Sequence, residues 1–377
     1  MKSNPKLSII IPIYNGAQYI NSTVHSILNS TYHNLELVLI DDGSTDGSLT
    51  VCTQMAASDP RIKVYHKTNS GIADARNYGL DHAAGDYIGF CDQDDEVSPE
   101  MYQSMLGRLA ADNSQAAICG CCRQKKNGER VIFEKFTDMV YENSRIKNKL
   151  LLPMLFKGFT AHDNHEITIY PTIWNCIISR QLIVEKNMRF RSFVSYEDDL
   201  IMLLQLLLQA ERISTLSDIL YYWNTNVHSE IHRSAVRYLP DLEVRQQSLV
   251  DFITENLSGS KISPEIINQY RYVQQCRNAL LQLDNAAAQS KYNLLHKIRE
   301  LRGSGSIRYL QSAPDRVSPA KGFVRNTMIL PLLRRNHVAT AYFINRAINA
   351  IRFFVEKYHI TEKLERKIKS AGRNTDA

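Results

Sequence analysis

The chain has 377 residues, of which 44% are hydrophobic and 22% charged, as is ordinary for a globular protein with a sizeable core. No apolar run approaches the roughly 20 residues that a membrane-spanning helix needs. The seven cysteines form no even disulfide framework, and the apolar run that begins at Leu7 is too short for a signal peptide. We therefore expect a reduced, cytoplasmic protein.

The formal net charge of +6 is unevenly distributed along the chain. Between Lys321 and Arg373 there are 12 lysines and arginines and three glutamates, whereas the rest holds 33 basic and 36 acidic residues. The basic character thus belongs to a C-terminal tail. An acidic body without a nucleic-acid motif excludes nucleic acid as the expected partner.

The first quarter of the chain alternates between short apolar runs and helical patterns. Strands are predicted at residues 7–12, 35–40, 62–66 and 87–91, and helices at 20–28, 46–55 and 71–82. Strands that alternate with helices through short links form right-handed βαβ units. The sequence therefore predicts an α/β fold with a mostly parallel sheet flanked by helices.

The remainder is mixed and then helical. Further strands are expected at 116–122, 131–133, 172–178 and 219–223, and helices at 141–156, 180–186, 200–210, 239–256, 264–283 and 292–301. We divide the chain into residues 1–115 and 116–235, two halves of one α/β domain, a helical region 236–313, and a basic tail 314–377. The last two form a C-terminal helical extension.

Three carboxylates follow the strand predicted at 87–91, namely Asp92, Asp94 and Asp95. Crowded carboxylates repel one another unless a cation joins them or some are protonated. Asp92 and Asp94 are two residues apart, so an extended backbone directs both to one side. Mg²⁺ and Mn²⁺ prefer oxygen ligands and often share them with phosphates. The motif is compatible with a metal–diphosphate site, although acidic strand ends also serve as turns and helix caps.

Other polar residues also follow predicted strands, at Pro12–Asn15 and Asp41–Asp42. In α/β sheets, ligands bind beyond the carboxyl ends of the strands, so these segments are expected to share one site. Together with later segments they resemble glycosyltransferase family 2 on the Rossmann-like GT-A fold. The segments that carry the resemblance are residues 8–15, 41–46, 71–79, 85–88, 92–95, 174–175, 197–199 and 221–222. The resemblance covers roughly residues 6 to 230.

The resemblance implies transfer of a sugar from a UDP-sugar to an acceptor hydroxyl with inversion. It points to a metal-dependent hexosyl- or N-acetylhexosaminyltransferase of bacterial surface polysaccharide synthesis. By position in the motifs, the nucleoside would be held by Pro12, Tyr14, Asn15 and Asp42. Arg76 would reach a base or phosphate. The structural alternatives are wall packing for Tyr14 and a surface ion pair for Arg76.

For the chemistry, the resemblance implies that Asp94 binds Mn²⁺ or Mg²⁺ and that Asp92 contacts the ribose or the sugar. His228 would be a further metal ligand, or else a solvent-exposed histidine. Asp198 is the expected catalytic base, and its acidic neighbours on either side are the alternatives. The three consecutive acidic residues 197–199 would also stabilise a helix N-terminus, which is the structural alternative to a catalytic role.

The tail predicts an amphipathic helix with Ala341, Ile344 and Ala347 on its apolar face and Asn345 on the opposite face. Such a helix favours docking on an anionic membrane surface, on the inner face of the cell membrane. Packing on the protein's own body or on a second subunit is the alternative. The expected acceptor is a saccharide or a lipid-linked saccharide.

Two other functions use a similar fold. A sugar-phosphate nucleotidyltransferase would need a glycine-rich phosphate loop after the first strand, which Pro12–Asn15 does not supply. A non-catalytic binding or assembly subunit could keep the fold, but it would not need Asp92, Asp94 and Asp198. The glycosyltransferase hypothesis accounts for all of these residues.

Overall fold

The computed structural model of the chain describes residues 4–124, 128–156, 169–191, 198–224, 251–252, 331–357 and scattered residues and short runs between 266 and 329. The chain divides into two compact units. The first comprises residues 1–157, 164–235 and 251–262, and the second comprises residues 158–163, 236–250 and 263–377.

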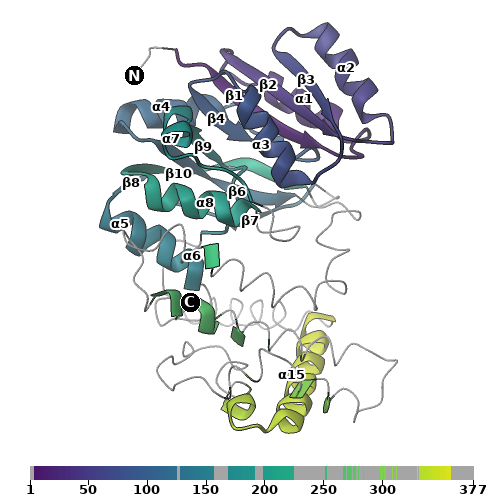
Figure 1. Cartoon of the computed structure of the whole chain (residues 1–377), viewed down its shortest axis with the longest axis vertical. Helices are drawn as coiled ribbons and strands as arrows, with labels where there is room; N and C mark the ends of the chain where they lie inside the picture. Colours follow the sequence, from purple (N-terminus) through teal and green to yellow (C-terminus); the bar gives the residue numbers. More distant parts are fainter. Residues whose placement is uncertain are drawn as a thin grey trace, which may run out of the picture. The chain divides into compact units, whose positions relative to one another are not determined.

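The strands of the first unit form one sheet (Figure 1), which has ten strands among the described residues. Their bounds are β1 Leu7–Ile13, β2 Leu35–Asp42, β3 Ile62–Lys67, β4 Tyr87–Phe90, β5 Glu96–Val97, β6 Ala116–Gln124, β7 Arg130–Glu134, β8 Met139–Glu142, β9 Cys176–Ser179 and β10 Arg212–Asn224. The order is β3-β2-β1-β4-β9-β6-β10-β5, with β7 beside β6 and β8 beside β10. The strands β1 to β4 are parallel, as predicted, whereas β9 runs antiparallel to β4 and β6 and makes the whole sheet mixed.

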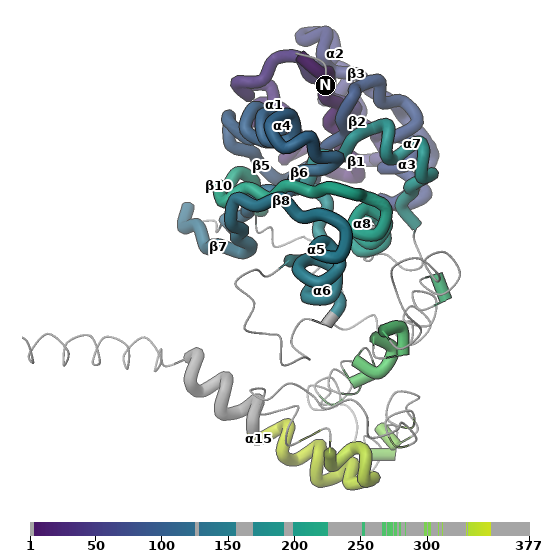
Figure 2. Tube along the Cα trace, turned by 90° about the vertical axis from the view of Figure 1, so that its left-hand side faces the viewer, coloured from purple at the N-terminus to yellow at the C-terminus, as the bar shows by residue number. Residues whose placement is uncertain are grey.

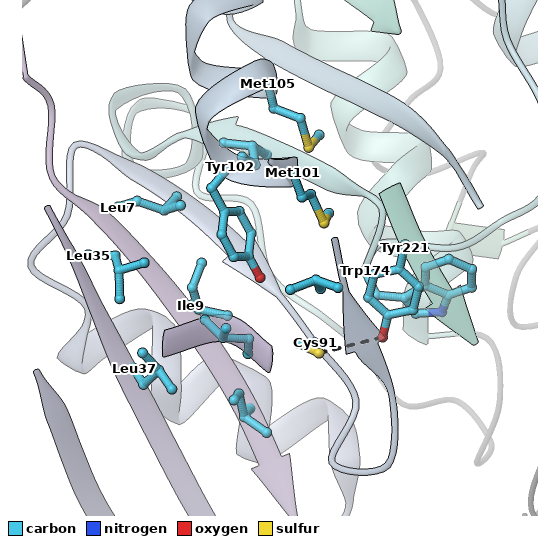
Figure 3. Packing of buried hydrophobic residues seen from close by; sticks show 14 of the residues in the cluster. Leu7, Ile9, Leu35, Leu37, Cys91, Met101, Tyr102, Met105, Trp174 and Tyr221 are labelled. Carbon is cyan, nitrogen blue, oxygen red and sulfur yellow. Dashed lines mark hydrogen bonds between the residues drawn. The ribbon is translucent and has the colours of Figure 1, made fainter. Parts of the chain in front are cut away.

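Helices cover both faces of this sheet. They are α1 Ile20–Leu28, α2 Ser48–Ser58, α3 Ile72–His82, α4 Met101–Asp112, α7 Arg180–Glu185 and α8 Asp198–Gln209. Figure 2 shows α1 and α4 on one side of the sheet and α3 and α7 on the other. Every residue of β1 and β2 is buried, which explains why both strands are mostly apolar and do not alternate between apolar and polar residues. Alternate residues of β1 and β2 pack with α1 and α4 in one hydrophobic cluster (Figure 3).

Several regions differ from the sequence-based prediction. The strand expected at 172–178 begins only at Cys176, as β9. The helix expected at 141–156 is instead β8, a short α5 (Ser144–Ile146), a π-helix at Lys147–Leu151 and α6 (Leu152–Phe156). The reason is that Tyr141 and Glu142 pair with β10. The sequence analysis also missed α4 and β5 and the first half of β10. The helices predicted at 239–256, 264–283 and 292–301 lie largely outside the described residues.

In the second unit, α15 spans Val338–Lys357. Among its residues up to 347, Val338, Ala341, Tyr342 and Asn345 are buried and lie at helical spacing, while Ala347 is exposed. Ala341 is thus on the packed face as predicted, whereas the prediction is wrong for Asn345, which is also on that face, and for Ala347, which is not. No helix in the described parts of the chain is both long enough and apolar enough to cross a bilayer.

Candidate functional site

The loops that follow β1, β2 and β4 are joined by side chain–backbone hydrogen bonds. Gln93 accepts a hydrogen bond from the Tyr14 amide at 3.0 Å and donates one to the Tyr14 carbonyl at 3.1 Å. Asn15 accepts from the Thr45 amide at 2.8 Å, and its own amide donates to Ser44 at 3.0 Å. Tyr14 itself is 50% exposed, so its ring is not wall packing in this structure and is accessible to a ligand.

Two aspartates end β2, and Pro12 lies buried in β1 beside this strand. Asp42 is buried and accepts hydrogen bonds from Lys67 Nζ at 2.6 Å, from the Ser70 amide at 3.1 Å and from the Gly71 amide at 2.9 Å. A carboxylate offers about four lone-pair positions, so Asp42 retains one for a ligand N–H. The sequence analysis missed Lys67, because nothing local indicates that the end of β3 pairs with Asp42.

Arg76 connects two acidic segments that are far apart in the sequence. Its side chain is 2% exposed, and its guanidinium donates to Asp92 at 2.9 Å and to Asp199 at 2.5 Å. The guanidinium carbon also lies 5.3 Å from the centre of the Phe190 ring. Arg76 is thus a buried bridge and not a surface ion pair. It joins the loop after β4 to the first turn of α8.

The end of β10 holds the loop 92–95 from the other side. The Tyr221 hydroxyl donates to Asp95 at 2.7 Å and accepts from the Asp92 amide at 3.2 Å. The Asn224 amide donates to Asp95 at 2.8 Å, and the Asn224 side chain donates to the Asp94 carbonyl at 2.9 Å. Burial, followed by the charges of Asp92 and Asp94, raises the pKa of Asp95 well above its ordinary value. From the sequence, Asp95 was predicted only as a member of the acidic motif and Tyr221 only as part of the segment 221–222, so neither had a role of its own.

The loop 92–95 has the chemistry of a divalent-cation ligand but does not form a complete cage. Among the described residues, no group of three His, Cys, Asp or Glu side chains could hold an ion by itself. Arg76 balances one charge at Asp92, while Asp94 adds a half-buried oxygen donor. Such a set fits Mg²⁺ or Mn²⁺, which take one or two carboxylates and complete their shell with phosphates and water. His228 lies outside the described residues.

Asp198 is the first residue of α8. Its side chain and the whole of Glu197 lie outside the described part of the structure. The next residue, Asp199, is 15% exposed and bound to Arg76. The structure therefore brings the start of α8 to the loop 92–95 through Arg76.

Comparisons with known proteins point to one family. Residues 8–166 match the model of glycosyl transferase family 2. The uncharacterized glycosyltransferase EpsJ of Bacillus subtilis is 30% identical over 312 residues, which cover 81% of this chain and 85% of EpsJ. The chain belongs to glycosyltransferase family 2. The uncharacterized glycosyltransferase YibD of Escherichia coli is 29% identical over 63% of this chain and 67% of its own length.

Among solved structures, residues 1–349 of Staphylococcus aureus TarS have the same fold. The TM-score is 0.60 at 19% identity, and the match covers 91% of this chain and 90% of the TarS chain. TarS has also been crystallised with UDP-GlcNAc and with UDP. This family 2 chain therefore has the GT-A fold expected from its sequence and is a glycosyltransferase.

Proposed function

We propose that the protein transfers a sugar from a UDP-sugar to an acceptor hydroxyl with inversion, for the synthesis of a bacterial surface polysaccharide. The observation that carries this proposal is the Arg76 bridge, which joins the loop holding Asp92 and Asp94 to the start of α8. The loop proposed to bind the donor is thus linked to the helix that begins at the proposed base, Asp198. The complexes of TarS with UDP and UDP-GlcNAc support UDP as the nucleotide.

On the donor side, Tyr14 would cover the uracil ring, and Asp42 would accept a hydrogen bond from the ring N–H. The exposure of Tyr14 and the remaining lone pair of Asp42 support these roles. Asn15, the other proposed nucleoside contact, joins the loops after β1 and β2 by hydrogen bonds. Asp94 would hold Mg²⁺ or Mn²⁺, which when bound offsets the charge of the departing diphosphate. His228 remains a proposed additional ligand.

On the acceptor side, Asp198 would take the proton of the attacking hydroxyl. Successive residues of an α-helix point about 100° apart, so Asp198 and Asp199 project in different directions. Because Asp199 is bound to Arg76, it is the poorer candidate for a base. A single attack on the face opposite the diphosphate inverts the anomeric carbon, and a positioned base contributes typically ~10²–10⁴-fold to the rate.

The test is to incubate the protein with UDP-glucose, UDP-galactose, UDP-GlcNAc and UDP-GalNAc and to measure the release of UDP. We expect release from at least one donor, its loss with EDTA and its recovery with Mn²⁺. UDP binding without release from any donor, with saccharide acceptors present, would instead support a non-catalytic binding subunit. Release of pyrophosphate from UTP and a sugar phosphate would identify a nucleotidyltransferase.

A further inference from the structure

An arginine and three aromatic side chains lie together near the ends of β6, β7 and β10. The Arg123 guanidinium is 5.2 Å from the centre of the Trp223 ring. Trp223 is 5.3 Å from Phe133, and Phe133 stacks on Tyr170 with ring centres 4.1 Å apart. All four side chains are partly exposed. We call these four residues the Arg123 wall.

The Arg123 wall lies at the same sheet edge as the donor loop. The strand β9 is antiparallel to both β4 and β6, so β6 runs in the direction of β4, and β10 is parallel to β6. Arg123 and Trp223 are register partners near the ends of β6 and β10. Trp223 also lies between Tyr221 and Asn224, the two residues that hold the loop 92–95. The Arg123 wall therefore lies beside the loop 92–95, on the side remote from the loops that follow β1 and β2.

Among the described residues, the Arg123 guanidinium contacts an aromatic ring but has no carboxylate partner. Within the described chain, its side chain makes no hydrogen bond and no ion pair, and its Nε atom is buried without an acceptor. A guanidinium held against an aromatic face presents its remaining donors in a fixed plane. That plane matches the two oxygens of a carboxylate or phosphate.

We propose that the Arg123 wall is a subsite for a negatively charged acceptor. An acceptor sugar would pack on Trp223 and Phe133, and its carboxylate or phosphate group would bind Arg123. This inference rests on the proposed function, because it assumes that the donor occupies the neighbouring loops. It adds the chemical class of the acceptor, an acidic or phosphorylated saccharide.

Arg130 provides a matched control. It lies on β7, opposite Gln124 and thus one position along from Arg123, so it points to the other face of the sheet. It also contacts an aromatic ring, with its guanidinium carbon 3.8 Å from the centre of Tyr222, and its Nε donates to Gln124 at 2.9 Å. A general effect of losing a surface cation would appear equally in Arg130→Gln.

The test uses the fluorescence of the full chain, which has two tryptophans. Trp174 is 6% exposed, so a ligand on the wall should change mainly the signal of Trp223. The probes are methyl glucoside, glucuronate and glucose 6-phosphate at equal ionic strength. We expect saturable changes with one or both charged probes and none with methyl glucoside. The two charged probes distinguish a carboxylate from a phosphate acceptor. Trp223→Phe should abolish the change.

Charge-assisted hydrogen bonds are the stronger class, so Arg123→Gln should weaken binding of the charged probe by at least about fivefold. Arg123→Lys should recover part of this loss, and Arg130→Gln should bind as the wild type. Equal responses to neutral and charged probes, no response at all, or unchanged binding by Arg123→Gln would overturn the inference. Titration of the wild type and each variant with UDP separates the two proposals. If the wild type does not bind UDP, the proposed function is contradicted. If UDP binds normally but the charged probes do not bind as expected, only the proposal for the Arg123 wall is contradicted.

Discussion

Arg76 joins the loop 92–95, on the proposed donor side, to the first turn of α8, on the proposed acceptor side. It is buried between Asp92 and Asp199, and breaking a buried ion pair by removing one partner typically costs about 3–5 kcal/mol. We expect Arg76→Ala to lower the free energy of unfolding in urea by roughly this amount and to reduce UDP release strongly. Arg76→Lys keeps the charge but not the two-sided fork, so it should lose less stability but still lose activity.

Arg189 offers the comparison for this prediction. It pairs with Asp81 at the surface, with the two side chains 37% and 57% exposed, and exposed pairs contribute about 0–1 kcal/mol. Arg189→Ala should therefore leave stability and UDP release close to wild type. If Arg76→Ala behaved in the same way, the bridge would be of no consequence for either property.

The two aspartates at the start of α8 should respond differently to the same change. Asp198→Asn is expected to lower sugar transfer by at least ~10²-fold without changing UDP affinity or stability, because only the base is lost. Asp199→Asn weakens the partner of buried Arg76 and should lower the unfolding free energy. Transfer assays and urea unfolding of both variants decide this, and near-normal turnover of Asp198→Asn would rule out its role.

Glu36 is a second buried charged residue with oppositely charged partners, and it lies away from the candidate site. Burial acts to raise its pKa, but hydrogen bonds from Lys6, Lys63, Ser8 and the Ala84 amide outweigh it and lower the pKa from 4.5 to about 2. A depressed pKa stabilises the fold above pH about 4.5, and this contribution disappears as the pH falls toward about 2.

The two lysines that pair with Glu36 are 37% and 40% exposed, so we expect a contribution on the order of 2 kcal/mol near neutral pH. Glu36→Gln should lose it, and its unfolding free energy should fall less steeply than that of the wild type between pH 4.5 and 2. Parallel pH profiles for the two proteins would show that Glu36 does not carry the predicted linkage.

At the scale of elements, the end of β10 fixes the loop after β4. Tyr221 is fully buried, and its ring stacks on Trp174 with centres 4.2 Å apart (Figure 3). Tyr221→Phe keeps this stacking and removes the hydroxyl that binds Asp95 and the Asp92 amide. We expect a stability loss of about 1–3 kcal/mol and weaker Mn²⁺-dependent UDP binding, measured by calorimetry. Tyr222→Phe, on the opposite face of β10, should change neither.

The sequence predicted the elements whose signal is local. The strands β1 and β2 are predominantly apolar, each with one polar residue near its start (Ser8 and Glu36), and polar residues follow their apolar runs, so their positions and the sheet edge they share could be predicted from the sequence directly. The helix α4 was missed although Met101, Met105 and Leu109 have helical spacing. The first half of β10 was missed because its buried Ser214 and Thr215 look like a loop; their burial depends on pairing with β6 and β8.

Roles that depend on contacts between distant segments could not be predicted. Lys67 and Tyr221 act on residues 25 and 126 or more positions away, and no local pattern marks such a partner. The side chain of the predicted base lies outside the described residues, so Asp198 stays a prediction, and only its neighbour Asp199 is seen in contact with Arg76. The motifs predicted the candidate site, and the structure added the residues that hold its loops.

At the scale of the whole molecule, charge is divided between an acidic body and the basic tail. Within this tail, the segment 321–373 holds 12 lysines and arginines against three glutamates. We propose that this tail binds an anionic membrane surface, where each Lys or Arg near the surface contributes about 1 kcal/mol at low ionic strength. A lipid-linked acceptor would then be reached from the membrane.

The full chain is therefore expected to sediment with vesicles containing phosphatidylglycerol, not with neutral phosphatidylcholine vesicles, and to be released by high salt. Replacing Lys363, Lys367 and Lys369 by Gln should weaken this binding more than tenfold, since three charges are removed. The matched control replaces three exposed lysines of the first unit, at positions 135, 149 and 186, by Gln. If both triple variants lost vesicle binding equally, the net charge of the protein and not the tail would be responsible. If neither variant lost binding, the tail would not bind the membrane, and packing against protein would be its role.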